Sequence, residues 1–340
     1  MTIVSPKSPK THHSSARAES TKRLRVGVIG VGHLGQHHAR LYAGLPGSIL
    51  AGVMDIKPDR ARLIGERYGA PAYPDPKTLL EQVDAISVAV PTSAHHSVVK
   101  TCLDAGVHVL VEKPIAVTSA EAQELVELAR KRGCILQVGH VERFNPVARA
   151  VRPSIGRPGF IECHRLSPFG ERGTDVDVVL DLMIHDLDMI LSFSPGSVEE
   201  VRAAGVPVLS STIDIANARI AFSSGCVANL TASRVSMTRQ RRLRLFQRDA
   251  YVSVDYHSRQ GVICRRVVRP GEPPKIEVEQ VQGGDEEPLK LQLEAFLHSV
   301  AAGTPPVVSG EDGAAALTLA HRVLEAIDTF VRRHTGPGKA

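Results

Sequence analysis

The sequence predicts an α/β fold in which a doubly wound parallel sheet is followed by an α+β domain with a largely antiparallel open sheet. Two observations lead to this fold class. Between residues 24 and 139, short apolar strands alternate with helices, which is typical of right-handed βαβ units around a parallel sheet. After about residue 150, short alternating segments follow one another with turns between them, which is typical of antiparallel strands.

The first part of the chain supplies the expected parallel sheet and its helices. Strands are predicted at residues 25–30, 49–55, 85–90, 108–111 and 135–139. Helices are predicted at residues 33–45, 58–68, 98–105 and 119–132. Ser119 is the expected N-cap of the last helix, because its hydroxyl can accept a free backbone N–H.

The second part begins with a helix, predicted at residues 178–191. Strands are expected at residues 216–222, 226–233, 242–246, 251–256 and 263–268. The polar, Pro- and Gly-rich residues 270–287 indicate a loop or a ragged sheet edge, and helices follow at 289–302 and 313–332. We therefore expect a disordered extension (1–23), a dinucleotide-binding domain (24–148) and a substrate and oligomerisation domain (149–334).

Composition narrows the class of protein. The 340 residues suit two globular domains, and 43% hydrophobic with 23% charged residues argues against general disorder. No apolar run is long enough to cross a bilayer, and no secretory signal is evident, so a cytoplasmic protein is expected. The five cysteines are scattered singly, which argues against structural zinc, and we expect no metal. The net charge of +5 suits an anionic small molecule and does not indicate nucleic acid.

A glycine-rich turn points to a nucleotide. The sequence Gly30-Val31-Gly32-His33-Leu34-Gly35 matches G-x-G-x-x-G between a predicted strand and a predicted helix. Gly30 permits the tight turn, Gly32 lets backbone approach a pyrophosphate, and Gly35 lets helix and strand pack closely. The alternative is a turn without a ligand, but its place in the fold favours a Rossmann cofactor site.

Asp55 bears on which dinucleotide binds. It ends the second strand, twenty positions after Gly35, where an acidic side chain accepts hydrogen bonds from the adenosine ribose. A carboxylate repels a 2′-phosphate, so NAD is expected rather than NADP. Lys57 and Arg60 lie close by and would soften this preference.

Lys113 is the first candidate catalytic residue. Glu112-Lys113-Pro114 follows a predicted parallel strand, and open α/β sheets place ligands at the carboxyl ends of such strands. The ammonium group can then stabilise a developing alkoxide on the substrate. The alternative is a solvated loop lysine.

Asp181 and His185 are the second candidate pair. Their i, i+4 spacing places them on one face of a helix whose intervening residues are apolar. His185 can accept a hydroxyl proton while Asp181 orients its ring. A structural pair with satisfied hydrogen bonds is an equal alternative on spacing alone.

An arginine cluster lies later in the chain. It comprises Arg239, Arg241, Arg242 and Arg244, with Arg234 upstream. A solvated strand face is the default interpretation. A clamp for the diphosphate of a nucleotide-sugar is the next, because guanidinium groups bind phosphate in a bidentate manner. Nucleic acid is the least favoured, since aromatic residues make up only 4% of the chain.

Taken together, residues from about 24 to 327 resemble the Gfo/Idh/MocA oxidoreductase family. The markers are the glycine turn, Asp55, and the segments 91–95, 112–114, 143–146 and 181–185. The resemblance implies NAD(P)-dependent oxidation or reduction of a sugar-like hydroxyl or carbonyl, with Lys113 and His185 as the catalytic pair and Asp181 in support. It also implies a cofactor site that includes Pro91, Thr92, His95 and Glu112, and a substrate region with Arg143, Asn145, His185 and Arg234. Residues 177–180 depart from the glycine-rich stretch that many members carry there.

Segments 177–185, 214–219 and 231–234 further resemble a bacterial subgroup linked to lipid A biosynthesis. That subgroup is similar to dehydrogenases that oxidise carbon 3 of UDP-N-acetylglucosamine. The alternatives are an inositol, polyol or other sugar dehydrogenase of the same family, or a non-catalytic NAD-binding sensor on the same fold. The resemblance also implies a homo-oligomer formed through the C-terminal sheet.

Overall fold

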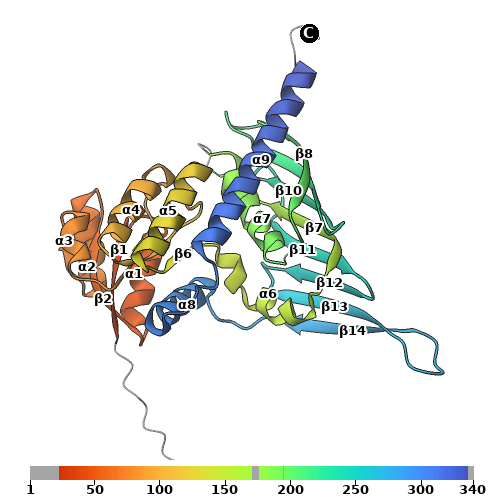
Figure 1. The fold of residues 1–340 in the computed structure, drawn as a ribbon, viewed down its shortest axis with the longest axis horizontal. Helices are drawn as coiled ribbons and strands as arrows, with labels where there is room; N and C mark the ends of the chain where they lie inside the picture. Colours follow the sequence, from red (N-terminus) through yellow and green to blue (C-terminus); the bar gives the residue numbers. More distant parts are fainter. Residues whose placement is uncertain (1–22, 171–175, 194, 336–340) are drawn as a thin grey trace, which may run out of the picture.

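Two β-sheets organise the chain in this computed structural model, which describes residues 23–170, 176–193 and 195–335 (Figure 1). The first sheet is parallel and has the order β3-β2-β1-β4-β5-β6. Its strands are β1 (Leu24–Ile29), β2 (Ser48–Met54), β3 (Ala72–Tyr73), β4 (Ala85–Val88), β5 (His108–Val111) and β6 (Leu136–Val138). The strand order reverses direction at β1 and β4, and this is where doubly wound sheets bind ligands.

The helices of this first domain agree with the pattern in the sequence. They are α1 (Gly35–Gly44), α2 (Pro58–Tyr68), α3 (Pro76–Leu80), α4 (His95–Asp104) and α5 (Ser119–Arg132). The short α3 and β3 were not predicted. The predicted N-cap of α5 was wrong by one residue. Thr118 is the cap, because its hydroxyl accepts the N–H of Glu121 while the Glu121 carboxylate accepts the N–H of Thr118.

The second sheet has eight strands in the order β14-β13-β12-β11-β7-β10-β9-β8. All neighbours are antiparallel except β7 and β10, so the predicted largely antiparallel sheet is confirmed. The strands are β7 (Pro158–Leu166), β8 (Val198–Val206), β9 (Ile215–Phe222), β10 (Val227–Ser233), β11 (Gln240–Gln247), β12 (Ala250–Asp255), β13 (Gln260–Val267) and β14 (Lys275–Gln282).

Three of these strands were not predicted as such. No predicted strand corresponds to β7 or β8, and β14 lies inside residues 270–287. That segment is therefore an edge strand at its centre, and the loop alternative was wrong there. Nearly all side chains of β14 are exposed, so the segment lacks the alternation of apolar and polar residues that marks a half-buried strand.

The helix that carries the predicted Asp181–His185 pair is not a single α-helix. A π-helical turn (Val179–Met183, η4) precedes α7 (Ile184–Leu191). A π-turn bonds residue i to i+5, so residues 179–183 are not α-helical. The helix predicted at residues 178–191 is corrected to a π-turn followed by α7. The remaining short helices are η1 (Thr92–Ala94), η2 (Val141–Phe144), α6 (Pro146–Val151) and η3 (Arg152–Ser154).

The last two helices connect the two sheets. In Figure 1, α8 (Pro288–Ala302) lies beside α1, while α9 (Gly310–Thr335) crosses from β6 to β8. Leu293, Phe296 and Leu297 of α8 are buried in the same core as Val26 and Tyr42 of the first domain. The range expected for the second domain therefore also contributes to the first core. Among the described residues, no helix is both long and apolar enough to span a membrane.

Candidate active site

The glycine turn follows β1 and is shaped by close backbone approach. Gly30 has a φ of +83°, and a Cβ there would lie 2.8 Å from the backbone of Ala89. A Cβ on Gly35 would lie 1.8 Å from the carbonyl oxygen of Gly30. At Gly32, by contrast, the nearest atom to a Cβ is a guanidinium nitrogen of Arg60 at 3.8 Å. The turn is thus closed on its protein side and open where a ligand would lie.

This open side borders a cavity of about 510 Å³. Its walls come from the turn and from α1 and α2, namely Val31, Gly32, His33, Gln36, Arg60, Leu63, Ile64 and Arg67. The turn leads directly into α1, whose N-terminal N–H groups favour an anion. The predicted cofactor residues His33 and Leu34 are exposed at this place. The cradle fits a dinucleotide phosphate.

Asp55 lies beneath this cavity and is saturated with hydrogen bonds. Its carboxylate accepts the N–H groups of Val31 and Lys57 at 2.9 Å each. Arg60 donates to both oxygens, with Nε at 3.0 Å and Nη2 at 2.7 Å. Burial opposes the charge, but the Arg60 guanidinium and the two N–H groups lower the pKa of the carboxyl, so it stays ionised. Ribose hydroxyls would have to replace Arg60, and the predicted ribose contact stays a prediction.

Lys113 follows β5, and its peptide bond to Pro114 is cis. Its ammonium donates to the backbone carbonyl of Asp181 at 2.7 Å and to the Asp181 carboxylate at 3.1 Å. The side chain is only 15% exposed. These bonds bring the carboxyl end of β5 to the π-turn, although the two residues are 68 positions apart. The structure therefore places together Lys113 and Asp181, which the sequence identified separately.

His185 lies in the first turn of α7 with its Nδ1 buried. Within the described ranges, Nδ1 has no hydrogen-bond partner, and the ring meets His140 edge to face with centroids 6.1 Å apart. Burial, followed by the positive charges of Lys113 and Arg165, holds the pKa of His185 well below its ordinary 6.5. The imidazole is thus neutral at neutral pH and can accept a proton.

The predicted support of His185 by Asp181 is not what the structure shows. In the part of the chain that is described, the hydrogen bonds of the Asp181 carboxylate go to Lys113 and none joins it to His185. The ammonium of Lys113 takes up this carboxylate instead, since it lies 3.1 Å from Oδ1 and also bonds the backbone carbonyl of Asp181. Asp181 therefore holds the lysine rather than the histidine.

Glu112 and His95 form a layer behind the site. Glu112 is buried and contacts Nε2 of His38 at 3.1 Å. The ring nitrogens of His95 lie 2.7 Å from the carbonyl oxygen of Pro114 and 2.9 Å from that of Val90. His95 thus ties the loop after β5 to the loop after β4. Pro91 and Thr92, which follow β4, are exposed and half-buried, respectively, and accessible to a ligand.

Arg143 and Asn145 are engaged within the protein. Arg143 donates to both oxygens of Asp188, at 2.8 and 2.6 Å, and so ties η2 to α7. Asn145 caps α6 by accepting the N–H of Val147 and donates to the carbonyl of Tyr256. Both residues shape the region around His185, and their expected contacts with a ligand stay predictions.

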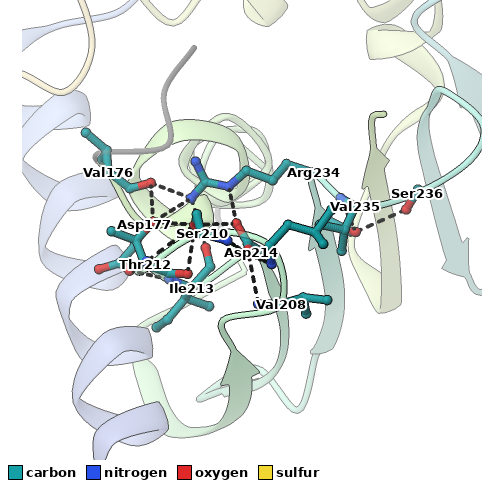
Figure 2. A network of polar contacts seen from close by, with 12 residues as sticks. Val176, Asp177, Val208, Ser210, Thr212, Ile213, Asp214, Arg234, Val235 and Ser236 are labelled. Atoms are coloured by element: carbon teal, nitrogen blue, oxygen red, sulfur yellow. Dashed lines mark hydrogen bonds and ion pairs between the residues drawn. The ribbon is translucent and has the colours of Figure 1, made fainter. Parts of the chain in front are cut away.

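Arg234 lies in a buried network that Figure 2 shows from close by. It donates to the carbonyl oxygens of Val176 and Ile213 and forms an ion pair with Asp214. Asp177 extends the network, since its carboxylate accepts the N–H of Ile213 and its carbonyl accepts the N–H of Asp181. The predicted substrate contact of Arg234 has no support here, because the guanidinium fixes the segment before the π-turn.

Asp177 and Asp214 were not identified as functional candidates from the sequence. They contact residues 36 and 20 positions away, respectively, and no local pattern marks such partners. In the described ranges, no group of three or more His, Cys, Asp or Glu side chains is arranged to hold a metal ion.

Comparison with known proteins accounts for this arrangement. A family model described as "Oxidoreductase family, NAD-binding Rossmann fold" matches residues 24–140, and one described as "GFO/IDH/MocA C-terminal domain" matches residues 149–252. The chain belongs to the Gfo/Idh/MocA oxidoreductase family. The resemblance predicted from the sequence is confirmed, and with it the expectation of an oxidoreductase with a nicotinamide cofactor.

Within the Gfo/Idh/MocA family, several relatives are similar over nearly the whole chain. A UDP-N-acetylglucosamine 3-dehydrogenase from Acidithiobacillus ferrooxidans is 39% identical over 319 residues, covering 91% of this chain and 99% of the relative. A solved structure of a protein of that name and organism has a TM-score of 0.86, with the same coverage of both chains. A myo-inositol 2-dehydrogenase from Thermotoga maritima is 28% identical over 326 residues, covering 90% and 96%.

Proposed function

We propose that this protein is an NAD-dependent dehydrogenase that oxidises the carbon 3 hydroxyl of UDP-N-acetylglucosamine. The observation that carries the proposal is Lys113 at the carboxyl end of β5, bonded to Asp181 four positions before the neutral His185. The substrate is proposed from the 39% identical relative, whose name states this activity. The inositol dehydrogenase is the second candidate, because its similarity also extends over nearly the whole chain.

In this proposal each side chain has a task. A bound nicotinamide would supply the acceptor for the hydride that leaves the sugar carbon. His185 takes the hydroxyl proton, and Nε2 is the nitrogen for this because Nδ1 is buried. Lys113 donates a hydrogen bond to the same oxygen and stabilises the negative charge that develops on it. Asp181 holds Lys113 in place. When the step is complete, the sugar carries a carbonyl group at carbon 3 and the proton is on the imidazole of His185.

We propose NAD as the cofactor because Asp55 is an ionised carboxylate at the ribose position. Its negative charge disfavours a 2′-phosphate. The phosphates would lie against Gly30, Gly32 and the N-terminus of α1, with Pro91 and Thr92 nearer the nicotinamide end.

We also propose a homo-oligomer formed through the second sheet. Figure 1 shows α6, α7 and α9 on one face of this sheet. On the other face, Phe160, Phe246 and Tyr251 form a row with ring centroids 5.8 and 5.1 Å apart. An apolar row without covering helices favours a second copy of the chain. Light scattering coupled to gel filtration should give a mass above one chain, and Phe246→Glu should lower it.

The decisive experiment is NADH formation by the purified protein with UDP-sugars, free sugars and inositols. An amine donor and a 3-keto-sugar aminotransferase are added to remove an unfavourable product. Turnover of UDP-N-acetylglucosamine alone supports the proposal, whereas turnover of inositols supports the second candidate. NAD binding without any turnover would favour a sensor and contradict both.

Two variants test the role assignment. His185→Gln and Lys113→Met should each lower kcat by about 100-fold or more, since acid–base and charge-stabilising groups contribute on this order. NAD binding, measured by calorimetry, should change little in either variant. Loss of NAD binding in both folded variants would contradict the assigned roles.

A further inference from the structure

The arginines of β11 are divided between the two faces of its sheet. Leu243 and Leu245 are buried on the face that the helices cover, so Arg241 shares that face and Arg242 does not. The register agrees, because Arg241 lies opposite the buried Arg165 of β7. Arg242 and Arg244 lie on the other face, where Arg244 pairs with Glu162. Only Arg241 of this strand therefore points toward the side that carries α7.

Arg165 forms ion pairs with two carboxylates, those of Glu142 and Asp186. It donates to Glu142 at 2.9 Å and to both oxygens of Asp186 at 2.9 and 2.8 Å. All three side chains are almost completely buried. Within the described residues, the ion pair of Arg241 is with Glu142 at 3.7 Å, and it shares that carboxylate with Arg165. Its side chain is 45% exposed, so this guanidinium keeps donors directed at solvent.

The charge of Arg241 acts on the reacting centre. It is one of the cations that lower the pKa of His185, after burial, Lys113 and Arg165. The pKa of Arg241 is itself lowered, first by burial and then by repulsion from Arg165, with Arg239 also contributing. Arg241 therefore lies near the proton acceptor, in a place that solvent reaches, and shares its one close carboxylate with Arg165.

We propose that Arg241 binds the diphosphate of the nucleotide-sugar substrate. The inference rests on the proposed function. In a sugar oxidised at carbon 3, the diphosphate is attached at carbon 1, two ring atoms away. A sugar placed at His185 therefore puts its diphosphate within one side-chain length of that residue. Arg241 borders this region, because it contacts Glu142, Glu142 bonds Arg165, and Arg165 bonds Asp186 next to His185. A guanidinium fork matches phosphate oxygens, and the anion removes the repulsion from Arg165.

The experiment compares Arg241→Gln with Arg242→Gln, a matched control on the same strand but on the opposite face. Arg241→Gln should raise KM for UDP-N-acetylglucosamine by about 10- to 100-fold, the range of a charge-assisted hydrogen bond. Arg242→Gln should leave it unchanged. By calorimetry, uridine diphosphate should bind to Arg241→Gln more weakly by a similar factor, with NAD binding as in the unaltered protein.

Arg241→Lys keeps the charge without the fork and tests the same site if the glutamine variant folds poorly. It should raise KM less than glutamine does, by roughly 3- to 10-fold. Equal KM values for Arg241→Gln and Arg242→Gln, in a protein that oxidises the nucleotide-sugar, would overturn the inference alone. Failure of the unaltered protein to oxidise any UDP-sugar would instead overturn the proposed function.

Discussion

Replacing Asp214 with asparagine tests the network that fixes the start of the π-turn. The Oδ2 of Asp214 accepts the backbone N–H groups of residues 208, 209 and 210 at 2.8, 2.7 and 2.8 Å. Its Oδ1 accepts the hydroxyl of Ser210 at 2.6 Å and lies 3.2 Å from Nε of Arg234. Asparagine can keep its amide oxygen toward the three N–H groups. Its NH₂ group then takes the place of Oδ1 and cannot accept a hydrogen bond from Ser210 or from Arg234.

The expected loss follows from these two contacts. Each hydrogen bond to a charged group contributes about 1.5–3 kcal/mol, and breaking a buried ion pair costs about 3–5 kcal/mol. Arg234 keeps its bonds to Val176 and Ile213, so we expect about 3–4 kcal/mol for Asp214→Asn. At about 2–4 °C for each kcal/mol, the midpoint of thermal unfolding falls by roughly 10 °C.

The assay is urea unfolding followed by far-UV circular dichroism, with Ser210→Ala as control. This change removes the hydroxyl that bonds Asp214 and Thr212 but keeps the ion pair of Asp214 with Arg234, so it should cost less, about 1–2 kcal/mol. The pKa of Asp214 lies below its ordinary 3.8, since its hydrogen bonds outweigh burial. The ionised carboxylate of Asp214 therefore contributes its full stabilisation above pH 3.8, and this contribution is lost as the pH falls further. Asp214→Asn lacks the contribution, so this variant should lose less stability on acidification. A loss under about 1 kcal/mol at an unchanged urea dependence would refute the reasoning.

Three further predictions concern cofactor and catalysis. Gly35→Ala should weaken NAD binding by about 100-fold, because its Cβ would lie 1.8 Å from the Gly30 carbonyl oxygen and open the phosphate turn. Gly44→Ala, with no atom within 4 Å of its Cβ, is the control in a fluorescence titration with NADH. The rate of oxidation should stay constant as the pH falls to 6.5 and decline only below it, because His185 must be neutral to accept the proton and its pKa lies below 6.5. A decline that begins above pH 7 in the kcat profile contradicts that assignment. Arg60→Ala should change the ratio of NADP to NAD dissociation constants at least about tenfold in favour of NAD, since the carboxylate of Asp55 loses its counter-charge. If calorimetry gives the same ratio for Arg60→Ala as for the unaltered protein, Arg60 has no part in cofactor choice.

Local patterns predicted the first sheet well and the second sheet less well. Buried strands such as His108–Val111, and helices such as Pro58–Tyr68, have both the periodicity and the flanking residues that define their ends. The π-turn at Val179–Met183 could not be predicted from spacing, because it depends on contacts with residues 208–214 and 234.

The same limit applies to the site. The positions of Lys113 and His185 followed from their motifs, but the partner of Asp181 did not, because Lys113 lies 68 positions away and only the fold brings the two together. The arginines of β11 could not be assigned to faces until the register with β7 was known.

The place of α8 has a consequence for synthesis on the ribosome. Leu293, Phe296 and Leu297 complete the core around the first sheet, yet they are made after every strand of both sheets. The nascent nucleotide-binding domain therefore waits, with an uncovered apolar surface beside Tyr42, until about residue 300 has left the exit tunnel. Chaperones that bind exposed apolar segments have that interval in which to act, and a chain that terminates before α8 should aggregate even though all six parallel strands are present.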